Sequence, residues 1–157
     1  DPARVGEPAV TLLRAIGDLH PQRAQLRLER SQRAAVVAPG QADLPPAAQL
    51  RTLVQAHFDV LLGPGSDFVP VMLYESRSLP QRQQKSLGKL IADYEALWLP
   101  VLTALHASGE LNAPVRLARL LILGALNWSV QWFDPQKGAS LQELTDAAMA
   151  LFLKTTD

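Results

Sequence analysis

The chain has 157 residues, enough for one domain with a substantial core but few for two. Its 15 Lys and Arg balance its 15 Asp and Glu, and a formal net charge of zero argues against binding duplex DNA through charge alone. The absence of cysteine excludes disulfides and thiolate chemistry. No apolar run reaches the roughly 20 residues that cross a bilayer, and the first ten residues do not resemble a signal peptide. We therefore expect a cytoplasmic protein without a membrane partner.

The first part of the chain, residues 1–37, is predicted to form amino-terminal helices. Between residues 21 and 37, one helical face carries a row of basic side chains: Arg23, Arg27, Arg30 and Arg33. This face is either solvated or a contact for an anion, such as the phosphates of a ligand or of nearby nucleic acid. The Pro- and Gly-containing residues 38–46 then predict a loop, and residues 47–153 the main bundle of a single domain.

The first helix of the bundle is predicted between Pro46 and Leu62, where the apolar residues share one face. His57 lies on that apolar face. A histidine in such a position is either a core residue with its hydrogen bonds satisfied or a polar contact for a ligand.

A long helix follows Ser78 and Pro80, and its apolar stripe includes Tyr94 and Trp98, one helical turn apart. Each of these two rings has an apolar body and one polar atom, which suits either core filling or a pocket for a small organic ligand. Pro100 lies within the same pattern and predicts a kink, because it lacks the N–H that would bond to the carbonyl of Ala96.

The stretch from Pro114 to Phe133 has apolar residues all around its helix and therefore needs covering on more than one side. Asn112 is its expected cap, and Gly124 in its middle predicts a close crossing with another helix. A second copy of the chain is the natural partner. Asn127 either sets the register of that dimer or contacts a ligand. Ser140 and Glu143 form the capping box of a last amphipathic helix.

Motifs for catalysis are missing from the sequence. The three histidines lack metal-ligand spacing, and there is no nucleotide-binding or hydrolase motif. We expect no enzyme activity, metal or cofactor, although a helical enzyme acting on an apolar small molecule stays a third alternative. No stretch alternates as a strand does. The predicted fold is all-α, an orthogonal or antiparallel bundle of about six to seven helices.

Two segments resemble the C-terminal half of TetR-type bacterial transcriptional repressors. The first is YESRSLP at 74–80, followed by the long helix. The second is LILGALNWSVQWFDPQKGASLQELTDAAMALFL at 121–153, with its G-A-x-N-W and W-[FY]-x-P elements, a Gly-containing turn and S-x-x-E-L. The resemblance extends over about residues 46–153 in helix order and length.

This resemblance implies that the last two helices pair with those of a second copy as a four-helix homodimer interface. The residues expected at that interface are Leu120, Leu123, Gly124, Trp128, Leu144, Ala148 and Leu151. The preceding helices would enclose an effector, a small lipophilic molecule with acyl-CoA-like compounds among the candidates. The residues expected at this ligand-binding site are His57, Phe58, Met72, Tyr94, Trp98 and Asn127.

Nothing before Pro46 resembles the helix-turn-helix domain with which members of that family begin. The resemblance therefore predicts transcription regulation in which DNA is bound only through a domain not in this chain. The alternative from a different class is a stand-alone helical dimerisation or protein-interaction module without a ligand.

Overall fold

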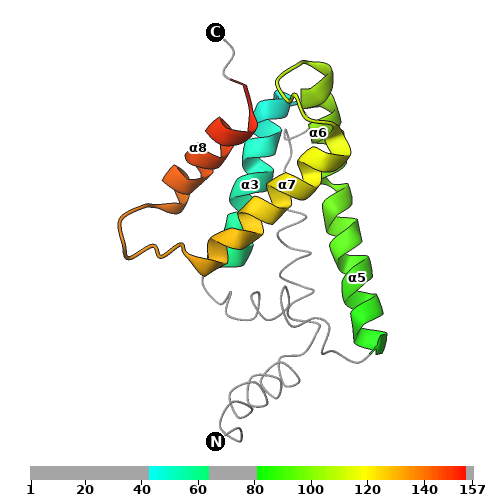
Figure 1. Ribbon diagram of the computed structural model, residues 1–157, viewed down its shortest axis with the longest axis vertical. Helices are drawn as coiled ribbons and strands as arrows, with labels where there is room; N and C mark the ends of the chain where they lie inside the picture. The colour runs from blue at the N-terminus through cyan, green and yellow to red at the C-terminus, as the bar shows by residue number, and fades with distance from the viewer. Residues whose placement is uncertain (1–42, 64–80, 155–157) are drawn as a thin grey trace, which may run out of the picture.

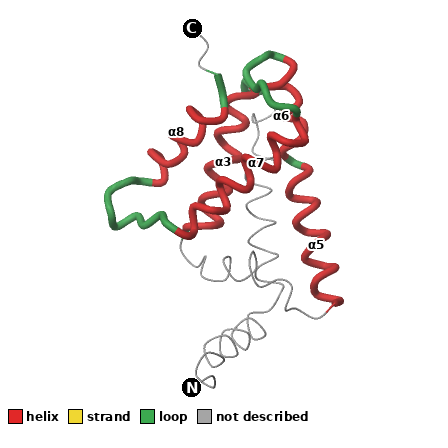
Figure 2. Tube along the Cα trace, in the orientation of Figure 1, coloured by secondary structure: helices red, strands yellow, loops and turns green. Residues whose placement is uncertain are grey.

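A computed structural model describes residues 43–63 and 81–154, and all regular structure within these residues is helical (Figure 2). The helices are α3 (Pro46–Leu62), α5 (Gln81–Ala96), α6 (Trp98–Ala107), α7 (Val115–Trp128), the 3-10 turn η3 (Ser129–Gln131) and α8 (Leu141–Phe152). The all-α prediction holds for this part of the chain. The predicted amino-terminal helices of residues 1–37, the face from Arg23 to Arg33, and Met72 lie outside the described residues.

Helix α3 lies at the centre and packs against α6, α7 and α8 (Figure 1). Its bounds are those predicted from the sequence, and the predicted apolar face is the buried one. The buried side chains of this face are Leu50, Leu53, Val54, His57, Phe58 and Leu61. Burying these apolar side chains stabilises the fold by about 25 cal/mol for each Å² of apolar surface removed from water. This hydrophobic contribution is the main one that holds the helices together.

The long helix predicted after Pro80 is broken at Leu97 into α5 and α6, which confirms the predicted kink. Pro100 is the third residue of α6 and has no N–H to donate to the carbonyl of Ala96, so the α-helical ladder cannot run through. Leu97 N instead bonds to Tyr94 O at 3.1 Å, a tighter turn. As a result, α5 extends away from the crossing of α3 and α7 (Figure 1).

Helix α7 divides into two faces. Ala118, Ile122, Leu123 and Leu126 are buried within the subunit, while the opposite face is apolar and exposed. The helix begins after Pro114, whose carbonyl accepts from Leu117 N and Ala118 N at 2.9 Å. Asn112 is therefore not the cap, because the rigid φ of Pro114 starts the helix two residues later.

The predicted capping box at the start of α8 is confirmed. Ser140 Oγ accepts from Glu143 N at 3.2 Å, and Glu143 Oε2 accepts from Ser140 N at 2.8 Å. The bonds to Ser140 hold the pKa of the Glu143 carboxyl below its usual value. Helix α8 is joined to α3 by an ion pair between Asp146 and Arg51. No helix among the described residues is long and apolar enough to cross a membrane.

Candidate ligand-binding site

Four side chains with polar atoms meet at the largely apolar core, and each comes from a different helix. They are His57 of α3, Tyr94 of α5, Trp98 of α6 and Asn127 of α7. We call them the His57 cluster. His57 Nδ1 lies 2.6 Å from Tyr94 Oη, and His57 Nε2 lies 3.0 Å from Asn127 Oδ1. The imidazole thus bridges α5 and α7 across the centre of the bundle.

The break at Leu97 places the aromatic members of the cluster. Tyr94 is in the last turn of α5, and Trp98 is the first residue of α6. The imidazole of His57 is stacked on Tyr94, with ring centroids 5.6 Å apart and planes at 23°. Trp98 meets both rings edge-on, at centroid distances of 5.8 Å to His57 and 6.2 Å to Tyr94. Edge-to-face contacts of this kind favour a fixed arrangement of the rings.

The hydrogen bonds define which nitrogen of His57 carries the proton. The same hydrogen bonds fix which way the side-chain amide of Asn127 points. Asn127 Oδ1 accepts, so His57 Nε2 carries the proton, and Nδ1 accepts from the Tyr94 hydroxyl. Burial lowers the pKa of His57 to about 4, opposed in part by the bond to Asn127. Burial also raises the pKa of Tyr94 above its ordinary value. The cluster is consequently uncharged near neutral pH.

Trp98 is 0% exposed, and its Nε1–H has no hydrogen-bond partner among residues 43–63 and 81–154. Trp98 lies beside the Tyr94 hydroxyl and opposes the rise in the pKa of Tyr94, but its Nε1–H does not form a hydrogen bond with the hydroxyl oxygen. A buried donor left unsatisfied costs about 1–3 kcal/mol. The cluster therefore contains one strong donor that the described residues do not use.

A charged pair lies beside the cluster. Arg119 of α7 is ion-paired with Glu95 of α5, the residue next to Tyr94, and both side chains are partly buried. This pair was not predicted, because neither residue has a pattern that marks a partner on another helix. It joins the same two helices as the His57 cluster. The described residues contain no group of three or more His, Asp or Glu side chains that could hold a metal ion.

The structure thus brings together four of the six residues expected at a ligand site. Phe58, also expected there, is 2% exposed and lies in the apolar core next to His57 in sequence. Met72 lies outside the described residues.

The residues expected at a dimer interface fall into two groups. Leu120, Trp128 and Leu151 are exposed, at 48%, 59% and 82%, and Gly124 is exposed as well. Leu144 is half-buried, whereas Leu123 and Ala148 are buried within the subunit. The exposed apolar residues of α7, which we call the outer face, are Leu117, Leu120, Leu121 and Trp128. Leu117 and Leu121 were not among the expected residues, although the helical spacing from Leu120 and Gly124 places them beside these two.

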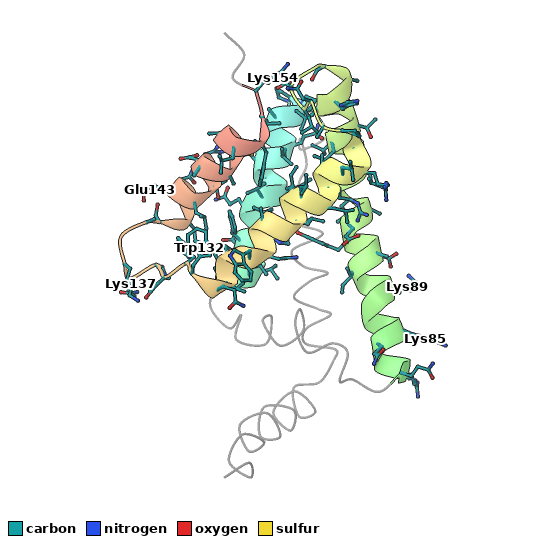
Figure 3. All side chains as sticks on the ribbon, viewed as in Figure 1. Lys85, Lys89, Trp132, Lys137, Glu143 and Lys154 are labelled. Carbon is teal, nitrogen blue, oxygen red and sulfur yellow. The ribbon has the colours of Figure 1, made fainter. Side chains whose placement is uncertain are left out.

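Trp132, also exposed at 59%, follows the carboxyl end of α7 (Figure 3). Gly124 lies in the outer face, and a Cβ built there meets no described atom within 4 Å. Packing among the described residues therefore does not explain the glycine. An apolar surface of this extent usually marks an interaction site.

Residues 43–156 match the family described as tetracyclin repressor-like, C-terminal domain. The chain belongs to this family. The predicted resemblance to TetR-type regulators is thereby confirmed, for the half of those proteins that lacks the helix-turn-helix. Among curated proteins, no sequence matches this tetracyclin repressor-like chain.

Solved structures show the same fold. The superantigen PfiT has a TM-score of 0.68 and 26% identity, with 85% of this chain and 72% of that one covered. AibR, in complex with isovaleryl coenzyme A and operator DNA, has a TM-score of 0.65 and 15% identity, covering 83% and 73%. SCO3833, a TetR-family transcriptional regulator from Streptomyces coelicolor A3, has a TM-score of 0.61 and 22% identity, covering 82% and 66%.

Proposed function

We propose that this tetracyclin repressor-like domain binds a small lipophilic effector at the His57 cluster and thereby regulates transcription as part of a repressor. The observation that carries the proposal is the cluster itself: four side chains with polar atoms, drawn from four helices, at a largely apolar core. A few polar groups converging among apolar and aromatic side chains are typical of small-molecule sites.

The cluster is also placed to pass on a signal. The bonds of His57 join α5 to α3 and α7, and the ion pair of Glu95 with Arg119 joins α5 to α7 a second time. The break at Leu97 separates α5 from α6. A ligand that takes over one of these bonds changes the position of α5, provided that it binds one position of α5 more tightly than another.

The DNA-binding step belongs to a separate helix-turn-helix domain, and the effector controls it through the relative placement of two such domains. AibR was crystallised with both isovaleryl coenzyme A and operator DNA, which supports an acyl-CoA-like compound as one candidate effector here. The proposed setting is the bacterial cytoplasm, where operator DNA is found.

The outer face of α7 is the proposed dimer surface. A second copy packed on it would cover Leu117, Leu120, Leu121 and Trp128, and Gly124 would allow the two α7 helices to approach closely. Leu151 of α8, at 82% exposed, would be covered by the same partner. Burying leucine and tryptophan side chains of this size contributes about 1.5–3 kcal/mol each.

Native mass spectrometry of the purified chain tests both parts of the proposal in one measurement. We expect the mass of a homodimer, with a small molecule retained from the expression host or taken up from added acyl-CoA. A monomer that retains nothing and takes up nothing would contradict the proposal. A dimer that binds no small molecule would favour the alternative, a dimerisation or protein-interaction module without a ligand.

A further inference from the structure

The indole N–H of Trp98 is the one feature of the His57 cluster that the protein's described contacts leave unexplained. The side chain is fully buried at 0% exposure, and Nε1 has no acceptor among the described residues. Native proteins seldom leave such a group without a partner, so an unpartnered donor points to a missing ligand or an ordered water.

Two acceptor atoms of the neighbouring side chains are already engaged within the cluster. His57 Nδ1 accepts from Tyr94, and Asn127 Oδ1 accepts from His57 Nε2. The hydroxyl of Tyr94 donates to His57 and keeps a lone pair, but Tyr94 lies edge-on to Trp98, at 6.2 Å between ring centroids, and Trp98 Nε1 forms no hydrogen bond with it. The partner of Trp98 must therefore bring its own acceptor atom, because an indole N–H only donates.

The charge of that partner follows from the same surroundings. His57 and Tyr94 are both held in their neutral forms by burial, which keeps the pKa of His57 at about 4. Arg119, the basic side chain that reaches α5 beside the cluster, is already paired with Glu95. An anionic group placed against Trp98 would lose its hydration without gaining a free cation, which is strongly unfavourable. An uncharged acceptor carries a much smaller penalty.

We infer that Trp98 determines ligand specificity by donating its indole N–H to an uncharged carbonyl oxygen on an apolar ligand. The carbonyl can belong to a ketone, an ester, a thioester or an amide. The inference rests on the proposed function, because it assigns the chemistry of the ligand bound at the His57 cluster. The apolar side chains that surround the cluster, Phe58 and Leu102 among them, suit the rest of such a molecule.

The test uses three probes of similar size: butyl methyl ketone, hexanoate and hexane. The chain has three tryptophans, so a nitrogen-15-labelled sample gives three indole N–H resonances, and Trp98→Phe identifies the one from Trp98. We expect the ketone to move the Trp98 resonance downfield, as a new hydrogen bond does, and hexane not to. Since one neutral hydrogen bond contributes about 0.5–1.5 kcal/mol, the ketone should bind Trp98→Phe roughly two- to tenfold more weakly. Hexanoate should bind the wild-type chain more weakly than the ketone.

Trp132→Phe is the matched control, because Trp132 is exposed at 59% and lies outside the His57 cluster, so its loss should leave ketone binding unchanged. Equal ketone affinity in wild type and Trp98→Phe would reject the role of Trp98 while leaving ligand binding intact. Tighter binding of hexanoate would reject an uncharged partner. A Trp98 resonance already at the hydrogen-bonded position without probe would show that the donor is satisfied without a ligand, by water or by Tyr94, and would reject the inference. If none of the probes binds, this inference is rejected, whereas the proposed function is rejected only if the chain also retains no small molecule and takes up no acyl-CoA. If Trp98→Phe does not fold, Trp128→Phe and Trp132→Phe identify the Trp98 resonance by elimination, and its shift with the ketone in the wild-type chain still tests the inference.

Discussion

His57 Nδ1 lies 2.6 Å from the hydroxyl oxygen of Tyr94, although the two residues are 37 positions apart in the chain. This bond ties the last turn of α5 to the middle of α3, and the opposite side of the same imidazole holds Asn127 of α7. Because the imidazole is buried, both of its nitrogen atoms need partners, and each partner comes from another helix. The arrangement of three helices thus depends on one neutral histidine.

Stability should therefore depend on pH through His57. The folded-state pKa is about 4, below the ordinary 6.5, so the unfolded chain binds more protons between these two values. The free energy of unfolding should fall as the pH is lowered from 6.5 towards 4, by about 1.4 kcal/mol per unit of pKa difference, or roughly 3 kcal/mol in all. Urea unfolding at a series of pH values measures this slope.

His57→Gln supplies the comparison, because glutamine keeps a donor and an acceptor but does not titrate. The acidic side chains contribute the same slope to both proteins, including Glu143, whose lowered pKa acts at more acidic pH. The difference between the two curves isolates the histidine. If the unfolding free energies of the two proteins changed in parallel from pH 7 to 4, the pKa of His57 would be the same in the folded and unfolded chain, and His57 would not be buried as described.

Removing the amide of Asn127 should destabilise the domain. In Asn127→Leu the Nε2–H of His57 loses its acceptor inside the core, at an expected loss of about 1–3 kcal/mol in the free energy of unfolding. Asn112→Leu is the matched control, since Asn112 is exposed and a surface change of this kind stays within about 0.5 kcal/mol. Equal losses in the two variants would remove Asn127 from the network.

Local signals in the sequence predicted most of the fold. The bounds of α3, the break caused by Pro100 and the capping box of α8 follow from short-range patterns, namely the apolar period, a missing N–H and the S-x-x-E spacing. The end of α6 also has a local cause, because Gly109 takes a φ of 80° just after it. The expectation that Asn112 caps α7 was wrong. The helix begins after Pro114, two residues beyond Asn112, because the proline ring fixes φ at a value that suits a helix start.

The site could be predicted only in part. His57, Tyr94, Trp98 and Asn127 were each selected as polar atoms on apolar helical faces, which is a local property. Their hydrogen bonds could not be predicted, because they depend on how α3, α5 and α7 cross, and 70 residues separate His57 from Asn127. The pair of Glu95 with Arg119 was missed for the same reason. Likewise, the sequence could not say that Leu123 and Ala148 face the subunit's own core.

The start of α8 offers a local test. Ser140→Ala removes the side chain that accepts from Glu143 N, and the loss of such a cap costs about 1 kcal/mol. The free energy of unfolding from a thermal or urea transition measures it. Glu143→Gln is the control, because it keeps the other half of the capping box and removes only the charge. Its smaller loss would show that the hydrogen bonds carry most of the effect, whereas a larger loss would assign it to the charge.

Two glycines in exposed helix positions give a matched pair for the dimer. A Cβ at Gly124 of α7 or at Gly88 of α5 meets no described atom within 4 Å, so within the described subunit both should accept a side chain. Replacing either glycine by leucine should stabilise its helix by about 1 kcal/mol, because glycine is the less favourable residue within a helix. Only Gly124 lies in the outer face. Gly124→Leu should therefore convert the dimer to monomer or aggregate in sedimentation, while Gly88→Leu keeps the dimer. A dimer that survives in Gly124→Leu would place the contact between the two copies away from this part of α7.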